Sequence, residues 1–211
     1  MFTFADLVPH KVVPVIAIDD LAHALPLADA LIAGGLPVAE ITFRSAVAAE
    51  VIRTITRERP QMIVGAGTVL SPEIVDEAKA SGAKFGVAPG LNPRVARHAQ
   101  AIGFPFMPGV ATATDIEAAL ELGCKVLKFF PAEAVGGAKM VSALSAPYQQ
   151  TGVQFMPTGG LTLDKLADYF KIKTVAVCGG TWIAKKEDMV AGRWDLITAN
   201  CKAVLATLKT K

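Results

Sequence analysis

Short apolar runs alternate with longer, helix-like stretches along almost the whole chain. The runs, rich in β-branched and other apolar residues, begin near Val12, Val38, Met62, Lys84, Pro105, Val126, Gln154 and Thr174. Helix-like stretches lie between them, including 21–33, 46–58, 72–80, 93–102 and 114–122. Short apolar runs bounded by turn residues predict strands, whereas longer periodic stretches predict helices. The pattern therefore predicts one strand–helix unit repeated along the chain.

The predicted helix boundaries carry suitable capping residues. Glycine, which ends helices because it accepts left-handed geometry, follows four predicted helices at Gly34, Gly82, Gly103 and Gly123. Ser71 and Asn92 each stand before a proline, the order expected of an N-cap and the first helical position. The segment 114–117 has the spacing of a capping box. These signals place a new strand within a few residues of each helix end.

Eight strand–helix units predict a single-domain (β/α)8 TIM barrel of the α/β class over residues 1–211. Some strands are apolar on both faces, as expected where helices cover a parallel sheet. Residues 2–10 predict a short N-terminal helix that closes the barrel bottom. The alternative is an open doubly wound sheet, which the absence of a GxGxxG motif after the first strand disfavours.

Composition and charge exclude several classes of function. The 211 residues are 52% hydrophobic and carry a net charge of +2, from 21 basic and 19 acidic residues. There is no basic block, so we expect no nucleic-acid partner. The three cysteines form no CxxC pair and the three histidines show no metal-ligand spacing, so neither a disulfide framework nor a metal site is expected. Neither a signal peptide nor a membrane span is apparent, which predicts a cytoplasmic protein.

Lys128 lies in the apolar run Val126–Pro131, which predicts a buried strand. Lysine is rarely fully buried, and burial favours the neutral amine over the ammonium ion. A neutral amine attacks a ketone and forms a Schiff base. The first hypothesis is therefore an imine-forming carbonyl enzyme. The alternative is a structural lysine that reaches solvent or pairs with a carboxylate.

Alternation along the second predicted strand places Glu40 and Arg44 on one face, together with Val38 and Thr42. The opposite face is apolar and suits packing against helices. If Lys128 also points inward, it meets Glu40 inside the barrel. A carboxylate can move protons during imine chemistry, and an arginine can hold the carboxylate of a 2-oxo acid. The alternative is a structural ion pair of Glu40 with Arg44.

Two glycine pairs end the last two predicted strands: Gly159–Gly160 and Gly179–Gly180, the latter followed by Thr181. Glycines allow close backbone approach to an anion, and barrels of this kind often bind phosphate after strands seven and eight. These glycines therefore predict a phosphate site, with Thr181 as a hydroxyl donor. Their alternative role is simply to form turns.

These segments together resemble the KDPG/KHG aldolases, which act on 2-dehydro-3-deoxy-6-phosphogluconate and 4-hydroxy-2-oxoglutarate. The resemblance runs from about Val12 to the C-terminal helix. Its motifs are Val12–Ile16, Glu40–Arg44, Gly65–Leu70, Pro89–Leu91, Lys128–Glu133, Pro157–Gly160 and Gly179–Trp182. The run Lys-Phe-Phe-Pro-Ala-Glu at 128–133 is highly specific among them.

The resemblance implies a metal- and cofactor-independent class I aldolase, typically a homotrimer, that releases pyruvate from a phosphorylated sugar acid in the Entner–Doudoroff route. It also implies cleavage of 4-hydroxy-2-oxoglutarate, with decarboxylation of oxaloacetate as a side reaction. In this resemblance Lys128 matches the Schiff-base lysine and Glu40 the general acid/base, which works through a water. The remaining matches are to pyruvyl carboxylate and pocket groups (Arg44, Thr68, Pro89, Phe130 and Thr158) and to a phosphate site (Gly159, Gly160, Gly179, Gly180 and Thr181).

The chain departs from its relatives after the first strand, where they often carry basic residues and it carries Asp19 and Asp20. Acidic side chains facing the mouth would lower the affinity for an anionic substrate. Relatives often have serine at the position of Thr181, so the hydroxyl is kept. Two other functions remain open. One is a phosphate-binding barrel such as an isomerase or a thiamine-phosphate-synthase-like enzyme, and the other is a silent binding barrel for sugar acids.

Overall fold

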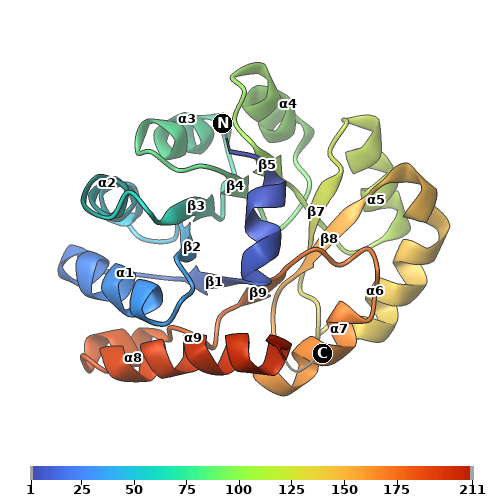
Figure 1. The fold of residues 1–211 in the computed structure, drawn as a ribbon. Helices are drawn as coiled ribbons and strands as arrows, with labels where there is room; N and C mark the ends of the chain where they lie inside the picture. Colours follow the sequence, from blue (N-terminus) through green and yellow to red (C-terminus); the bar gives the residue numbers. More distant parts are fainter. Residues whose placement is uncertain (1, 210–211) are drawn as a thin grey trace.

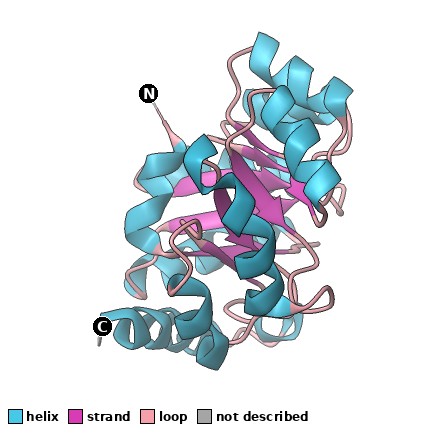
Figure 2. Cartoon of the chain, turned by 90° about the vertical axis from the view of Figure 1, so that its right-hand side faces the viewer, coloured by secondary structure: helices cyan, strands magenta, loops and turns pink. Residues whose placement is uncertain are grey.

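Parallel strands form the interior of the molecule and helices cover the outside, as Figures 1 and 2 show. The computed structural model describes residues 2–209. The strands are β1 (Val12–Ile16), β2 (Val38–Thr42), β3 (Ile63–Gly67), β4 (Gly86–Val87), β5 (Phe106–Met107), β6 (Gly109–Val110), β7 (Val126–Phe129), β8 (Gln154–Pro157) and β9 (Cys178–Gly180).

The helices follow the strands along the chain. The α-helices are α1 (Ala24–Ala33), α2 (Ala48–Glu58), α3 (Pro72–Ala80), α4 (Pro93–Ala101), α5 (Ala113–Glu121), α6 (Gly137–Ser145), α7 (Leu166–Phe170), α8 (Lys186–Val190) and α9 (Trp194–Lys209). Four 3-10 helices accompany them: η1 (Phe4–His10), η2 (Leu21–His23), η3 (Ala146–Thr151) and η4 (Leu163–Lys165). The predicted strand–helix alternation is therefore confirmed.

The strands lie in two parallel sheets. A curled six-stranded sheet has the order β5-β4-β3-β2-β1-β9, and a three-stranded sheet has the order β6-β7-β8. Two isolated parallel bridges, Phe155–Val175 and Thr158–Gly179, link β8 to the segment around β9. An α/β fold with parallel strands is confirmed, but a closed eight-stranded barrel is not shown as one continuous sheet.

Two strand predictions need correction. The run predicted from Pro105 is divided into β5, which pairs with β4, and β6, which pairs with β7. Pro108 stands between them and has no N–H to donate to a ladder. The last strand was predicted from Thr174 but begins at Cys178, because the residues before it form only an isolated bridge and a local turn bond from Val175 N–H to the Ile172 carbonyl.

The helix caps agree with the sequence, with one shift. Ser71 accepts a hydrogen bond from the backbone of Ile74, and Asn92 accepts one from Arg94. The capping box of α5 is formed by Thr112 and Asp115, two residues before the predicted position. This position is favoured over the predicted one because Asp115 accepts hydrogen bonds from the backbone N–H groups of Ala111 and Thr112, which would otherwise be unpaired before the helix.

The N-terminal 3-10 helix η1 lies across the interior in the view of Figure 1, at the end of the strands where β1 begins. Leu7 is buried, and the ring of Phe2 stacks on Phe85 with 5.5 Å between centroids. Phe85 directly precedes β4. These contacts agree with the predicted role of this segment in closing the N-terminal end of the strands. A substrate site is therefore expected at the opposite, C-terminal end of the strands.

Candidate active site

Lys128 and Glu40 meet inside the fold. Lys128 Nζ, on β7, donates a hydrogen bond to Glu40 Oε1, on β2, over 3.1 Å, although the two residues are 88 positions apart in the sequence. Lys128 is 5% exposed and Glu40 is fully buried. The predicted meeting of these two side chains is therefore observed. Two buried ionisable groups in contact are costly unless something compensates for their lost hydration, and active sites are where such pairs often occur.

One oxygen of the Glu40 carboxylate lacks a hydrogen-bond partner among the described residues. This oxygen, Oε2, is buried. A Cβ atom on Gly67, at the end of β3, would lie 2.3 Å from Glu40 Oε1, so only glycine leaves space for the carboxylate there. Because a buried acceptor is costly to leave unsatisfied, Oε2 is suited to a water or a substrate hydroxyl.

The Phe130 ring lies close to both Lys128 and the glycine loop after β8. The Phe130 ring centroid lies 5.5 Å from Lys128 Nζ. A Cβ on Gly159 would lie 3.2 Å from that ring, and a Cβ on Gly179 would lie 2.2 Å from the Thr158 hydroxyl oxygen. These close approaches connect the ends of β7, β8 and β9. The first glycine of each predicted pair is therefore fixed by packing at the site.

Pro89 and Thr68 occupy the same edge of the strands. A Cβ on Gly109, the register partner of Lys128, would lie 2.2 Å from the Pro89 carbonyl carbon, so Pro89 lies directly against the strand next to the lysine. Thr68 follows Gly67 and has a φ of 58°, a left-handed conformation uncommon for a residue with a Cβ. Such strained residues occur at ligand sites, where the surrounding structure holds them.

Arg44 lies near the mouth. Its Nε donates to the Thr42 hydroxyl over 3.2 Å, and Thr42 donates to the Ile16 carbonyl. Arg44 also lines a cavity of about 480 Å³ together with Gly160 and Thr181. This volume, hereafter the mouth cavity, joins the arginine to the predicted phosphate groups.

The site predicted from the sequence is thus gathered at one edge of the strands. Several contributing residues were missed. Gly67 belongs to the motif Gly65–Leu70, but the sequence assigned it no role. Position 109 requires glycine because the backbone of Pro89 packs against it, and no local sequence pattern indicates that contact. Glu133 also stood in a motif without a role.

Glu133 fastens the loop that carries Gly159 and Gly160. Its backbone N–H donates to the Gly159 carbonyl, and a Cβ on Gly160 would lie 2.8 Å from the Glu133 Cβ. The carboxylate accepts hydrogen bonds from Lys165 Nζ and from the buried Tyr169 hydroxyl. Burial alone would raise the pKa of Glu133, but these hydrogen bonds lower it below its ordinary value. Glu133 therefore stays ionised at neutral pH and ties α7 to the glycine loop.

The cysteines and acidic residues provide no metal centre within residues 2–209. No group of three or more His, Cys, Asp or Glu side chains in this range could hold a metal ion. Cys124, Cys178 and Cys201 are buried and unpaired, and burial raises the pKa of the Cys201 thiol to about 12. A thiol with so high a pKa is a poor nucleophile at neutral pH. No helix in the same range is long and apolar enough to cross a membrane.

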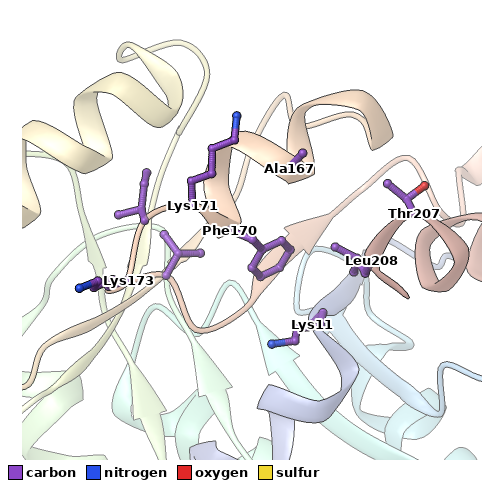
Figure 3. Close-up of a pocket in the computed structure, with 9 residues that line it drawn as sticks. Lys11, Ala167, Phe170, Lys171, Lys173, Thr207 and Leu208 are labelled. Carbon is purple, nitrogen blue, oxygen red and sulfur yellow. The ribbon is translucent and has the colours of Figure 1, made fainter. Parts of the chain in front are cut away.

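A second cavity, of about 280 Å³, lies at the opposite end of the strands. Figure 3 shows its lining residues, which come from α7, the segment before β9, the end of α9 and Lys11 before β1. Lys11 Nζ lies 5.7 Å from the Phe170 ring centroid. None of the predicted site residues lines this cavity, whereas Arg44, Gly160 and Thr181 line the mouth cavity.

Comparison with known proteins places the chain in a family. The family described as KDPG and KHG aldolase matches residues 5–200. A 2-dehydro-3-deoxy-phosphogluconate aldolase of Haemophilus influenzae is 48% identical, over 94% of this chain and 93% of the relative. A KHG/KDPG aldolase of Escherichia coli K12 is 42% identical, over 91% and 89% of the two chains.

A solved structure agrees with these relatives. The KDPG aldolase of Legionella pneumophila, with pyruvate captured as a covalent carbinolamine intermediate, superimposes with a TM-score of 0.90 at 38% identity, over 96% of this chain and 98% of that one. Both the sequence and the fold thus point to the same assignment. The chain belongs to the KDPG and KHG aldolase family.

Proposed function

We propose that this protein is a class I aldolase that cleaves 2-dehydro-3-deoxy-6-phosphogluconate to pyruvate and glyceraldehyde 3-phosphate through an imine on Lys128. The observation that carries the proposal is the buried contact of Lys128 Nζ with Glu40, 3.1 Å long, in a chain of this family. The Legionella pneumophila relative captured pyruvate as a carbinolamine, the adduct that precedes an imine. Cleavage of 4-hydroxy-2-oxoglutarate to pyruvate and glyoxylate is the second activity, and oxaloacetate decarboxylation is a side reaction of the same imine.

The neutral amine of Lys128 attacks the C2 ketone, and the carbinolamine loses water to give a protonated imine. Glu40 is close enough to take a proton from the amine and to return it to the departing hydroxyl, directly or through a water on Oε2. Glu40, as the base, then takes the C4 hydroxyl proton, directly or through the same water, and the C3–C4 bond breaks so that C4 leaves as the aldehyde carbon of glyceraldehyde 3-phosphate. The bonding electrons move into the imine and leave an enamine, which is protonated at C3 and hydrolysed to pyruvate.

The other predicted residues bind the two ends of the substrate in this proposal. Arg44 and Thr68 hold the carboxylate next to the ketone, and Pro89, Phe130 and Thr158 form the walls around the reacting carbons. The phosphate lies against Gly159, Gly160, Gly179, Gly180 and Thr181. Arg44, Gly160 and Thr181 line one cavity, which supports a substrate that extends between them.

Borohydride trapping with pyruvate tests the imine. Reduction of the wild-type protein in the presence of pyruvate should leave a stable adduct on the peptide that contains Lys128, found by peptide mapping. Lys128→Ala should give no adduct and no turnover. Lys125→Ala, an exposed lysine three positions earlier, is the matched control and should trap pyruvate normally. A folded wild-type protein without an adduct would instead favour a binding barrel without imine chemistry.

We infer that the two sheets belong to one closed (β/α)8 barrel in a single domain. Two observations support this: only Pro108 separates β5 from β6, and two isolated bridges, Phe155–Val175 and Thr158–Gly179, connect the region of β8 to the region of β9. A homotrimer stays a prediction from the family resemblance, and a cytoplasmic location stays a prediction from the sequence. Light scattering on the purified protein checks the trimer, which has three times the 22.1 kDa mass of one chain.

A further inference from the structure

The mouth cavity contains more positive charge than the family resemblance assigns. Its charged lining residues are Arg44, Lys185, Lys186 and Glu187, beside Gly160 and Thr181. Arg44 is bound to Thr42 and is assigned to the substrate carboxylate. Lys185 and Lys186 lie at the start of α8, five and six residues after Gly180. These two lysines are therefore the cations closest in the chain to Thr181.

The assigned phosphate groups are all neutral. They are backbone N–H groups of glycines and one threonine hydroxyl, whereas a phosphate monoester carries about −1.5 to −2 charges at pH 7. Neutral donors hydrogen-bond a phosphate but do not offset its charge, and ionised donors form the stronger bonds. Because Lys185 and Lys186 line the same cavity as Gly160 and Thr181, they can supply the missing charge.

Asp19 makes an ion pair with Lys186, one of the lysines that line the mouth cavity. It joins the segment after β1 to the start of α8, and the side chains are 51% and 58% exposed. The hydrogen bond with Asp19 raises the pKa of Lys186, so the lysine is an ammonium ion. Exposed pairs of this kind hold weakly in water, so a doubly charged phosphate can replace Asp19 as the partner of Lys186.

The two acidic residues after the first strand therefore have different roles. Asp20 accepts a hydrogen bond from the Ala22 backbone and caps η2, and Asp19 is neutralised by Lys186. Because of the pairing with Lys186, Asp19 does not simply repel an anionic substrate. Asp19 competes with the substrate for one lysine, whereas Asp20 is engaged with its own backbone.

We propose that Lys185 and Lys186 bind the distal phosphate and determine the preference for phosphorylated substrates, and that Asp19 holds Lys186 at the mouth until phosphate replaces it. The proposal rests on the proposed aldolase function. 4-Hydroxy-2-oxoglutarate is shorter and has no phosphate, so it reaches neither lysine. The two lysines thus act on KM for one substrate and leave the chemistry at Lys128 unchanged.

The test compares Lys186→Gln, Lys185→Gln and Asp19→Asn with the wild type on both substrates. Lys186→Gln should raise KM for the phosphorylated sugar acid by roughly 3- to 10-fold, with kcat and the constants for 4-hydroxy-2-oxoglutarate unchanged. Lys185→Gln should act in the same direction. Asp19→Asn should lower the same KM, because Lys186 loses its competing partner. Added salt should raise KM less in Lys186→Gln than in the wild type.

Two control variants remove the same charges elsewhere. Lys173→Gln removes a lysine at the cavity of Figure 3, and Asp195→Asn removes an exposed acid on α9. Both should behave as the wild type. An unchanged KM in Lys186→Gln, with normal pyruvate trapping on Lys128, would overturn the lysine proposal and leave the aldolase function standing. A wild type that fails to trap pyruvate would overturn the aldolase function itself, and the lysine proposal with it.

Discussion

Replacing Gly67 by alanine tests the placement of the Glu40 carboxylate without removing any functional group. The new Cβ would lie 2.3 Å from Oε1 and 2.9 Å from both Cγ and Cδ of Glu40, whereas real contacts stay beyond 3.0 Å. The carboxylate must therefore move by at least about 0.7 Å. Glu40 is fully buried, so any movement of its carboxylate changes contacts inside the site. The contact with Lys128 is the one that this movement disturbs.

The expected cost follows from that displacement. A misplacement of about 1 Å in a reacting group costs roughly 10²-fold in rate, so kcat should fall by about that factor. Overpacking a filled site also costs about 1–3 kcal/mol of stability, which leaves a protein of ordinary stability folded. Lys128 itself is untouched, so borohydride should still trap pyruvate on it. The variant should therefore keep the capacity to form the imine while slowing the proton transfers that depend on Glu40.

Gly90→Ala is the matched control, because it adds the same methyl group next to Pro89 on the same edge of the strands. A Cβ on Gly90 meets nothing within 4 Å, and its φ lies outside the left-handed region. It should retain wild-type kcat and trapping. Steady-state turnover, trapping yield and urea unfolding should be measured on both variants. A folded Gly67→Ala variant with kcat within about twofold of the wild type would refute the role of the Glu40 position.

Three further predictions follow from the other contacts of the site. Lys128→Met leaves the buried Glu40 charge unpaired and should lower the free energy of unfolding by about 3–5 kcal/mol, and the double variant Lys128→Met/Glu40→Gln should recover part of that loss. Urea titrations measure both variants, and an equal loss of unfolding free energy in the single and the double variant would contradict the prediction. Because the pKa of Glu133 is lowered in the fold, its ionised carboxylate stabilises the protein at pH values above about 4.5, and this contribution is lost as pH falls through the lowered pKa. The difference in unfolding free energy between the wild type and Glu133→Gln, measured with urea, should therefore be largest near neutral pH and shrink in acid, and a difference independent of pH would contradict the ionised contact. Thr181→Ala should raise KM for the phosphorylated substrate by roughly 10-fold and spare 4-hydroxy-2-oxoglutarate, since it loses one hydrogen bond to a charged group; equal effects on both substrates would exclude a phosphate contact.

The local pattern was enough to place most elements. The helix α3 covers the stretch predicted from its apolar spacing, because capping and periodicity agree there. The fifth and last strands were less predictable. Pro108 interrupts one ladder, and the residues before Cys178 lack continuous pairing, although both runs are apolar enough for strands. Pairing depends on the neighbouring strand, which a single run of sequence does not contain.

The site divides in a similar way. Strand alternation was sufficient to predict that Glu40 faces inward and meets Lys128, because a side-chain period of two fixes the face. The need for glycine at positions 67 and 109 comes from atoms on other strands. The pairing of Asp19 with Lys186 joins residues far apart in the chain, and neither residue carries a local signal for it. Contacts between distant segments therefore had to come from the structure.

The two ends of the site place different demands on charge. At the buried end, Lys128 and Glu40 are shielded from bulk solvent, so a single added or lost charge changes both stability and chemistry. At the mouth, Asp19 and Lys186 are about half exposed, so partners can exchange at little cost. A substrate with a reacting ketone at one end and a phosphate at the other matches this division. Substitutions at the buried end should therefore change kcat, and substitutions at the mouth should change KM.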